Sequence, residues 1–147
     1  TVAENIVYGN PKLRDISEND LVKMLDEKGM TELLKRLPEG IQTKVETGGE
    51  NISIGQKQLI SFVRTVLREP QLLILDEATA NIDTVTEQQL ERILDKLPAS
   101  TTKVVIAHRL NTIANADEIF FINSGEIIPA GSMEHALDML LNGKRVS

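Results

Sequence analysis

The stretch QLLILDEATANID, residues 71–83, decides the fold that we predict for this chain. Its apolar run, residues 72–75, is too short to span a membrane and lacks the alternation of a half-exposed strand, which predicts a fully buried strand of a parallel sheet. Asp76 and Glu77 follow where that strand ends, and ligands collect at the carboxyl ends of strands in open α/β sheets. Successive side chains of a strand point to opposite sides, so one carboxylate can hold a metal while the other handles a proton. The alternative interpretation is a strand that ends in a solvated acidic turn.

The composition is typical of a single soluble domain. The chain has 147 residues, of which 41% are hydrophobic and 26% charged, and its net charge of -6 argues against a nucleic-acid-binding surface. It has no cysteine, which excludes disulfides and thiolate metal sites. Its apolar runs are far shorter than the ~20 residues of a transmembrane helix, and no signal peptide is visible. The opening TVAENIVYG is typical of the middle of a domain, so we expect the chain to be a piece of a longer protein.

Hydrophobic periodicity predicts helices before the opening stretch and alternating strands and helices after it. Ser53 is a candidate N-cap, and Thr84 with Glu87 has the spacing of a capping box. The predicted helices are residues 17–29, 31–37, 56–68, 84–97, 110–115 and 132–141, and the further strands are 103–107, 118–122 and 126–129. This order indicates an α/β fold with parallel pairing. The turn at Ser124 and Gly125 predicts that the last two strands are antiparallel.

The segments ISIGQ (52–56), LLILDEATANID (72–83) and VVIAHRL (104–110) follow one another with helices between them. In this order the chain resembles the nucleotide-binding domain of an ATP-binding cassette (ABC) transporter of the exporter type. ISIGQ resembles the signature usually written LSGGQ, with Ile54 where glycine is commonest. Residues 71–77 resemble the Walker B strand, residues 80–83 the D-loop, and His108 the switch histidine.

Two further segments carry the same resemblance. TVAENIVYG resembles the segment that follows the Q-loop in exporters, and KVETGGEN resembles the loop ahead of the signature, with Glu46 where many exporters have glycine. The resemblance implies an α/β P-loop NTPase (ABC ATPase) fold for a partial nucleotide-binding domain over residues 1–147. Residues 1–69 would form the helical subdomain and signature helix. Residues 70–147 would form the Walker B half with the D-loop, switch histidine and C-terminal strands and helix.

The sequence contains no P-loop string, GxxxxGK followed by Ser or Thr. We expect the P-loop, the aromatic residue that stacks on adenine and the Q-loop glutamine to precede Thr1. In this fold the P-loop strand lies between the strands predicted at 103–107 and 118–122, so we expect a gap in the sheet. Unpaired strand edges are costly, so we expect the chain by itself to rearrange or to oligomerise through them.

The resemblance implies ATP and Mg²⁺ as cofactors and gives roles to the acidic stretch. Asp76 would hold magnesium through water, because this ion keeps much of its hydration shell. Glu77 would orient or deprotonate the attacking water. His108 would contact the γ-phosphate, although an isolated histidine is more often a surface or packing residue. The other histidine, His135, is interpreted as part of the last helix without a functional role.

The resemblance also implies a phosphate site at the start of the helix that follows the signature. Ser53, Ile54, Gly55 and Gln56 would contact ATP held by the P-loop of a second nucleotide-binding domain, because a helix start offers free amides and the positive end of its dipole. Taken alone, this tetrapeptide is typical of an ordinary helix cap. Asp83 would lie at the seam of the same head-to-tail dimer, and its alternative interpretation is a helix-start acid.

The implied function is the ATP-binding and ATP-hydrolysing part of an ABC transporter that drives export across a membrane. Its partners would be the second nucleotide-binding domain and the transmembrane domain, at the cytoplasmic face of a bacterial inner membrane. Without a P-loop the chain alone is expected to bind ATP very weakly and not to hydrolyse it. The alternative is a non-hydrolysing interaction module that pairs with a complete ABC ATPase domain. No feature of the sequence indicates the transported substrate.

Overall fold

The computed structural model describes most of the chain and divides it into two compact units. Residues 1–76, 82–106, 115–123, 125–131, 134–135 and 137 are described. Unit 1 is Thr1–Val104 and unit 2 is Val105–Ser147. Every described residue of the predicted site lies in unit 1. The predicted division of the chain at residue 70 stays a prediction.

Short helices build the first half of unit 1. They are α1 (Val2–Val7), η1 (Pro11–Leu13), α2 (Glu18–Glu27), α3 (Thr31–Leu34), η2 (Gly40–Gln42) and η3 (Thr47–Gly49). Ser17 caps α2 as its sequence predicts, since its hydroxyl accepts a hydrogen bond from the Asp20 amide at 3.2 Å. Gly29 follows α2 with a φ of 71°, the left-handed conformation in which many helices end. Helix α3 ends at Leu34, three residues before its predicted end, and the chain continues through turns.

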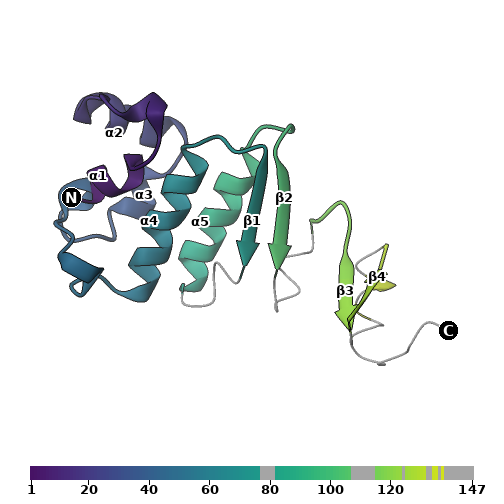
Figure 1. The fold of residues 1–147 in the computed structure, drawn as a ribbon. Helices are drawn as coiled ribbons and strands as arrows, with labels where there is room; N and C mark the ends of the chain where they lie inside the picture. Colours follow the sequence, from purple (N-terminus) through teal and green to yellow (C-terminus); the bar gives the residue numbers. More distant parts are fainter. Residues whose placement is uncertain (77–81, 107–114, 124, 132–133, 136, 138–147) are drawn as a thin grey trace. The chain divides into compact units, whose positions relative to one another are not determined.

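Helix α4 (Ile54–Val66) runs beside α5 (Thr84–Asp95) in unit 1 (Figure 1). Its apolar side chains recur at helical spacing and pack into one core cluster with residues of α1, α2, α3 and α5. Burial of each such side chain contributes about 1.5–3 kcal/mol. The buried members from α4 are Leu59, Ile60, Phe62, Val63 and Val66. The core therefore fixes the direction of α4, and the first turn of the helix stays at the surface.

Strands β1 (Leu72–Asp76) and β2 (Thr102–Ile106) form a two-stranded sheet and run in the same direction (Figure 1). Next to the strands, the Thr102 amide donates a hydrogen bond to the Gln71 carbonyl at 2.8 Å. This sheet confirms the predicted strand order in this part of the chain. The strand predicted at 103–107 begins one residue earlier, and Ala107 lies outside the described residues.

The prediction that these strands are fully buried is wrong. Leu73 is buried, but the side chains of Leu72 and Ile74 are 54% and 59% exposed, and Val104 of β2 is exposed as well. Successive side chains of a strand point to opposite faces, and only the face with Leu73 and Leu75 packs against the helical core. The uninterrupted apolar run therefore has one covered face and one open face in this structure.

Unit 2 contains an antiparallel pair, β3 (Phe120–Asn123) and β4 (Glu126–Pro129), which confirms the predicted hairpin. The register runs from Phe120 opposite Pro129 to Asn123 opposite Glu126. β3 begins two residues after its predicted start, although the Ala130 amide still donates to the Ile119 carbonyl at 2.8 Å. β2 and β3 belong to different sheets. The predicted gap between them stays a prediction.

The remaining predicted helices are described to different extents. The cap of α5 is Asp83 and not Thr84, so the helix begins one residue earlier than a cap at Thr84 predicts. α4 begins two residues before its predicted start and ends two residues before its predicted end. The helices predicted at 110–115 and 132–141 lie mostly outside the described residues. In the part of the chain that the structure describes, no helix is long and apolar enough to cross a membrane.

Candidate functional site

The start of α4 is closed by a reciprocal pair of side-chain hydrogen bonds. The Gln56 amide donates to the Ser53 hydroxyl at 3.2 Å, and the Ser53 amide donates to Gln56 Oε1 at 3.0 Å. This capping box confirms Ser53 as the N-cap. The amides of Ile54 and Gly55 have no acceptor within the described residues, and the first turn carries no acidic side chain. The helix start therefore combines free N–H groups with an uncompensated positive dipole end.

Ile54 is the first residue of α4 and its side chain is 65% exposed. It is not part of the hydrophobic core, unlike the apolar residues in the later turns of the helix. Exposed hydrophobic side chains occur singly on most protein surfaces. Here the position is informative, because the isoleucine borders the two free amides. Any ligand that approaches these amides would pass next to this side chain.

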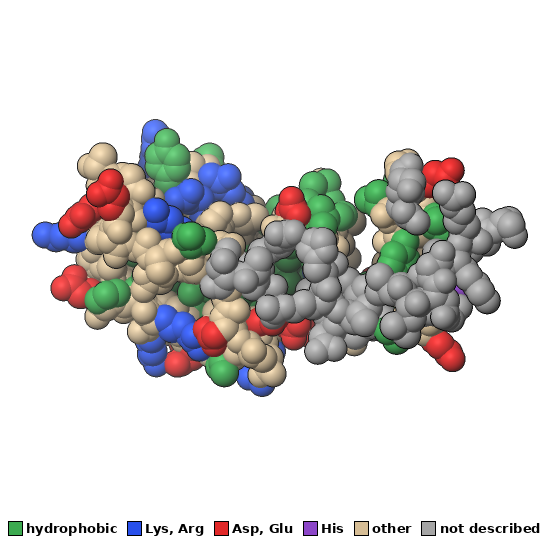
Figure 2. Space-filling view, turned by 90° about the horizontal axis from the view of Figure 1, so that it is seen from below, with side chains coloured by type: hydrophobic (Ala, Val, Ile, Leu, Met, Phe, Trp, Pro, Cys, Tyr) green, Lys and Arg blue, Asp and Glu red, His purple; other side chains and the backbone are tan. Residues whose placement is uncertain are grey.

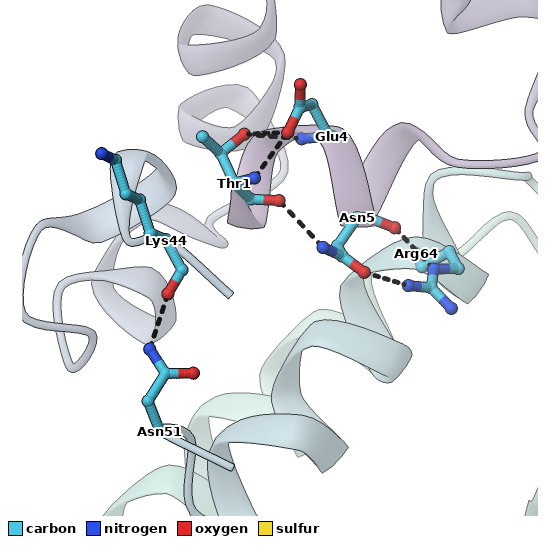
Figure 3. Close-up of polar contacts among 6 residues, drawn as sticks. All are labelled: Thr1, Glu4, Asn5, Lys44, Asn51 and Arg64. Atoms are coloured by element: carbon cyan, nitrogen blue, oxygen red, sulfur yellow. Dashed lines mark hydrogen bonds and ion pairs between the residues drawn. The ribbon is translucent and has the colours of Figure 1, made fainter. Parts of the chain in front are cut away.

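A single amide side chain closes the loop ahead of α4. Asn51 Nδ2 donates to the Lys44 carbonyl at 2.8 Å (Figure 3), and Asn51 Oδ1 accepts from the Glu46 amide at 3.1 Å. Gly49 has a φ of 65°, and a Cβ there would lie 3.0 Å from Lys57 Cε. The backbone conformation favours glycine at this position, and the Lys57 side chain of α4 lies close to it. The loop is held in one shape directly before Ser53.

Asp76 is the last residue of β1, and its side chain is exposed. It makes no hydrogen bond or ion pair among the residues that the structure describes. The described residues also contain no cluster of three or more His, Asp or Glu side chains that could enclose a metal. A single accessible carboxylate fits magnesium better than a closed protein cage would, because Mg²⁺ keeps several waters and often uses one or two carboxylates.

Asp83 caps α5, as its alternative interpretation of a helix-start acid requires. Asp83 Oδ1 accepts from the Thr86 amide at 3.2 Å, and Oδ2 accepts from the Thr86 hydroxyl at 2.6 Å. The guanidinium of Arg36 also donates to Oδ2, at 2.5 Å. The hydrogen bonds from Thr86, followed by the charge and hydrogen bond of Arg36, lower the pKa of Asp83 to about 2. The carboxylate is therefore ionised at neutral pH.

The described candidates lie at one end of unit 1. The first turns of α4 and α5 and the carboxyl end of β1 are all at the lower end of unit 1 in Figure 1. The structure thus brings the segment from Ser53 to Gln56, Asp76 and Asp83 to the same side. Glu77 and His108 lie outside the described residues, so their predicted roles stay predictions. His135 is exposed and helical, and it belongs to unit 2.

Figure 2 views the molecule from below Figure 1, which is the end of unit 1 where α4 and α5 begin. Over unit 1, acidic and basic side chains are interspersed. Hydrophobic side chains gather over the sheet of β1 and β2, where Leu72 and Ile74 are exposed. On the described part of unit 1 that this view shows, no single large patch of one charge is present.

Two arginines that the sequence analysis did not single out organise unit 1. Arg64 of α4 donates to the Asn5 carbonyl at 2.6 Å and to its Oδ1 at 3.2 Å, which ties α1 to α4 (Figure 3). Arg36 reaches Asp83 across 47 positions of sequence. No local spacing signals such partners, because a helical or strand period relates only near neighbours. Only the folded arrangement identifies these two residues.

Comparison with known proteins decides the family. Residues 1–80 match the family described as ABC transporter, which is more than half of the chain. The chain belongs to the ABC transporter family. This family match covers α1 to the end of β1, including the ISIGQ signature and Asp76. The match confirms the resemblance that the order of the motifs predicts.

The similar proteins include ABC transporter proteins and a flippase. The chain is 45% identical over 137 residues to the ABC transporter ATP-binding protein YfiC of Bacillus subtilis, covering 93% of this chain and 22% of that protein. It is 41% identical to an ATP-dependent lipid A-core flippase of Idiomarina loihiensis, covering 94% of the chain and 23% of the flippase. For a fatty acid ABC transporter ATP-binding/permease protein of Mycobacterium tuberculosis the identity is 42%, covering 90% of the chain and 20% of that protein. The ABC transporter chain thus spans less than a quarter of the length of these relatives.

A solved structure supports the fold as well as the family. The structure of a bacterial Atm1-family ABC exporter with ATP bound matches with a TM-score of 0.76 and 29% identity, over 100% of this chain and 27% of the exporter chain. The chain therefore has the α/β fold of part of the ABC ATPase domain. Its neighbour in structure is of the exporter type, as the motifs predict.

Proposed function

We propose that this chain supplies the signature, Walker B and D-loop segments of the ATP-hydrolysing domain of an ABC exporter. The observation that carries the proposal is the start of α4, where two free amides and a neutral cap lie at the same end of unit 1 as Asp76. Free amides at a helix start bind phosphate groups, and a carboxylate at a strand end suits a hydrated Mg²⁺. The family match supports ATP and Mg²⁺ as the ligands.

The role of Ser53 to Gln56 is to bind phosphate oxygens in trans. Ser53 and Gln56 hold each other's backbone amides, so the cap is complete without any ligand. The amides of Ile54 and Gly55 remain available to an anion from outside the chain. Because Ile54 projects beside them, its side chain limits how closely the phosphate of a second domain can approach. We expect this isoleucine to weaken the contact and not to abolish it.

The role of Asp76 is to hold Mg²⁺ through water. When bound, this ion neutralises charge on the β- and γ-phosphate oxygens of a nucleotide. Asp76 has no partner in the described residues that would compete for its carboxylate. Glu77, the next residue, is proposed to orient or deprotonate the attacking water. His108 is proposed to contact the γ-phosphate, and these two assignments rest on the sequence motifs.

The proposed partners are a second nucleotide-binding domain and a transmembrane domain. A signature that acts in trans needs a second domain to carry the P-loop, which corresponds to a head-to-tail dimer with Asp83 at its seam. The flippase relative and the exporter of known structure support transport across a membrane. The position of this chain at the cytoplasmic face rests on the sequence resemblance. Because the sequence contains no P-loop string, the chain alone is proposed to bind MgATP very weakly and not to hydrolyse it.

The test compares two charge-neutralising variants in the full-length protein that carries this chain. Asp76→Asn is expected to lower ATPase activity at least ~100-fold, because phosphoryl transfer depends on positioning and charge stabilisation. It should also remove most of the Mg²⁺ dependence of ATP binding, measured by titration calorimetry. Asp15→Asn is the matched control, since Asp15 is an exposed acid that makes no contact among the described residues. It should behave as the unaltered protein.

Three results would each contradict a part of the proposal. Full activity in Asp76→Asn would remove the metal role of Asp76. A full-length protein that binds a complete ABC ATPase domain but hydrolyses no ATP would favour the interaction module instead. For the chain alone, micromolar binding of MgATP in calorimetry would overturn the proposed very weak binding.

A further inference from the structure

Arg36 links the starts of the two long helices of unit 1. Its backbone carbonyl accepts a hydrogen bond from Gln56 Nε2 at 3.3 Å, and its guanidinium Nη1 donates to Asp83 Oδ2 at 2.5 Å. Gln56 belongs to the first turn of α4, and Asp83 is the cap of α5. One residue therefore contacts the signature with its backbone and the D-loop acid with its side chain.

The backbone at Arg36 is held in place from both sides. Leu34 and Leu37 are both buried in the core cluster, and the Leu37 amide donates to the Leu34 carbonyl at 3.0 Å. Arg36 lies in the turn between them. The carbonyl that receives Gln56 is thus attached to a part of the chain that cannot shift without disturbing buried side chains.

The two residues that Arg36 contacts are themselves fixed. Gln56 uses its Oε1 to accept from the Ser53 amide, while its Nε2 reaches Arg36. Asp83 accepts from both the amide and the hydroxyl of Thr86, whose side chain is buried. A continuous series of hydrogen bonds therefore runs from the cap of α4 through Arg36 to the cap of α5. Each hydrogen bond in this series restricts the position of the side chain or carbonyl that makes the next one.

The ion pair itself contributes little to stability. The side chains of Arg36 and Asp83 are 36% and 56% exposed, and exposed pairs are weak because water and salt screen them. Its effect on geometry is different, because it joins segments that are 47 residues apart. Loss of this contact would leave each helix capped but would free their starts to move relative to each other.

We propose that Arg36 is a positioning residue that holds the signature at the start of α4 in a fixed relation to Asp83 at the start of α5. This inference rests on the proposed function, in which both segments face the same partner domain. With the two starts fixed, closure of the dimer brings the free amides and Asp83 into contact with the partner domain at the same time. Without Arg36, the two segments engage the partner separately, and fewer closures lead to hydrolysis.

The choice of arginine follows from the geometry. The guanidinium is a planar group with several donors, and it keeps its charge at every physiological pH. A lysine at position 36 keeps the backbone contact with Gln56 and the positive charge near Asp83, but it loses the planar array of donors. Arg36→Lys should therefore restore part of what Arg36→Ala removes.

The test measures ATP hydrolysis and hydrogen exchange in the full-length protein. Arg36→Ala is expected to lower kcat by roughly 5- to 20-fold with little change in KM for ATP, the size of effect seen for residues that modulate coupling between sites. Deuterium uptake should rise together in the peptides that cover residues 53–57 and 82–87. Arg36→Lys should recover at least half of the lost activity.

Lys35→Ala provides the matched control. Lys35 forms a neighbouring exposed ion pair with Glu32 at 2.5 Å, within one short segment. Its removal deletes a comparable surface pair without touching α4 or α5, so activity and exchange should match the unaltered protein.

The outcomes separate this inference from the proposed function. If the unaltered full-length protein hydrolyses no ATP, the proposed function fails, and hydrogen exchange still tests the link. Unchanged exchange at residues 82–87 in Arg36→Ala would overturn the link. Unchanged kcat in an otherwise active protein would overturn the positioning role. Equal losses in Arg36→Ala and Lys35→Ala would also overturn it, because the effect would then be a general cost of removing a surface charge.

Discussion

The starts of α4 and α5 have nearly the same backbone shape and opposite electrostatics. The N-cap of α4 has φ and ψ of -63° and 159°, and that of α5 has -69° and 156°. Serine caps α4, and no acid lies in its first turn. Aspartate caps α5, and Glu87 lies in its first turn. The positive end of α5 is therefore neutralised by the chain itself, whereas that of α4 is left for a ligand.

This difference shows why a helix start alone does not predict an anion site. Ser53 satisfies hydrogen bonds with a neutral hydroxyl, and its capping partner Gln56 is also neutral. Asp83 satisfies the equivalent bonds with a carboxylate, which repels a phosphate. A search for anion sites should therefore consider the charge of the cap as well as the free amides.

The strongest test gives α4 the cap of α5. Ser53→Asp keeps a good N-cap, so the helix should remain folded. It places a negative charge near the phosphate that the site is proposed to bind. Two like charges about 4 Å apart repel by about 4 kcal/mol at an effective dielectric constant near 20, which corresponds to roughly a thousandfold in affinity. ATPase activity of the full-length protein should fall at least ~100-fold.

Ser53→Thr is the control for this change, because it keeps a neutral hydroxyl cap. Its activity should stay within a few-fold of the unaltered protein. Retained activity in Ser53→Asp, with α4 still folded by circular dichroism, would mean that the neutral cap has no part in anion binding.

Removal of either helix cap is expected to have an intermediate effect, a loss of unfolding free energy. Ser53→Ala removes the cap of α4 and should cost about 1 kcal/mol of unfolding free energy, a usual value for an N-cap. Asp83→Ala should cost more than Ser53→Ala, because Asp83 also accepts from the Thr86 hydroxyl and from Arg36. Urea unfolding of the complete nucleotide-binding domain would compare the two variants. An equal or smaller cost for Asp83→Ala would show that these extra bonds add nothing to the cap.

The smallest expected effect is a pH dependence of the stability that the cap of α5 contributes. The folded state lowers the pKa of Asp83 from 3.8 to about 2, so it favours the ionised carboxylate. The stability from Asp83 is therefore fully present above pH 3.8 and is lost as the pH falls towards about 2. The difference in urea midpoint between the unaltered domain and Asp83→Asn should shrink over this window. Ser53 does not titrate there, so the midpoint difference for Ser53→Ala should stay constant.

The sequence predicted the local features of this comparison better than the tertiary ones. Ser53 was identifiable because a capping residue precedes a clear apolar period. The cap of α5 was misassigned to Thr84, whose spacing to Glu87 also fits a capping box. The structure selects Asp83, one residue earlier, where the carboxylate gains Thr86 and Arg36 as partners. When two neighbouring residues could each cap a helix, contacts with residues far away in the sequence decide which of them does.

The strand between these helices was predicted in position but not in burial. A continuous apolar run predicts β1 correctly, because only a strand or a short buried helix accommodates it. Whether both faces are covered depends on which other segments pack there, and residues 72–75 contain no information on that. Arg36 escaped prediction for a related reason, since its two partners lie 20 and 47 positions away.

The open face of β1 makes the solution behaviour of the chain depend on ionic strength. Leu72 and Ile74 offer an apolar contact to a second copy, while the net charge of -6 keeps copies apart. Added salt shortens the range of that repulsion to about 8 Å at physiological ionic strength. Approach to the isoelectric point, near pH 5.0, removes the repulsion altogether. Dilute, mildly alkaline buffers will therefore keep the chain dispersed, and salt or mild acid will drive it to associate.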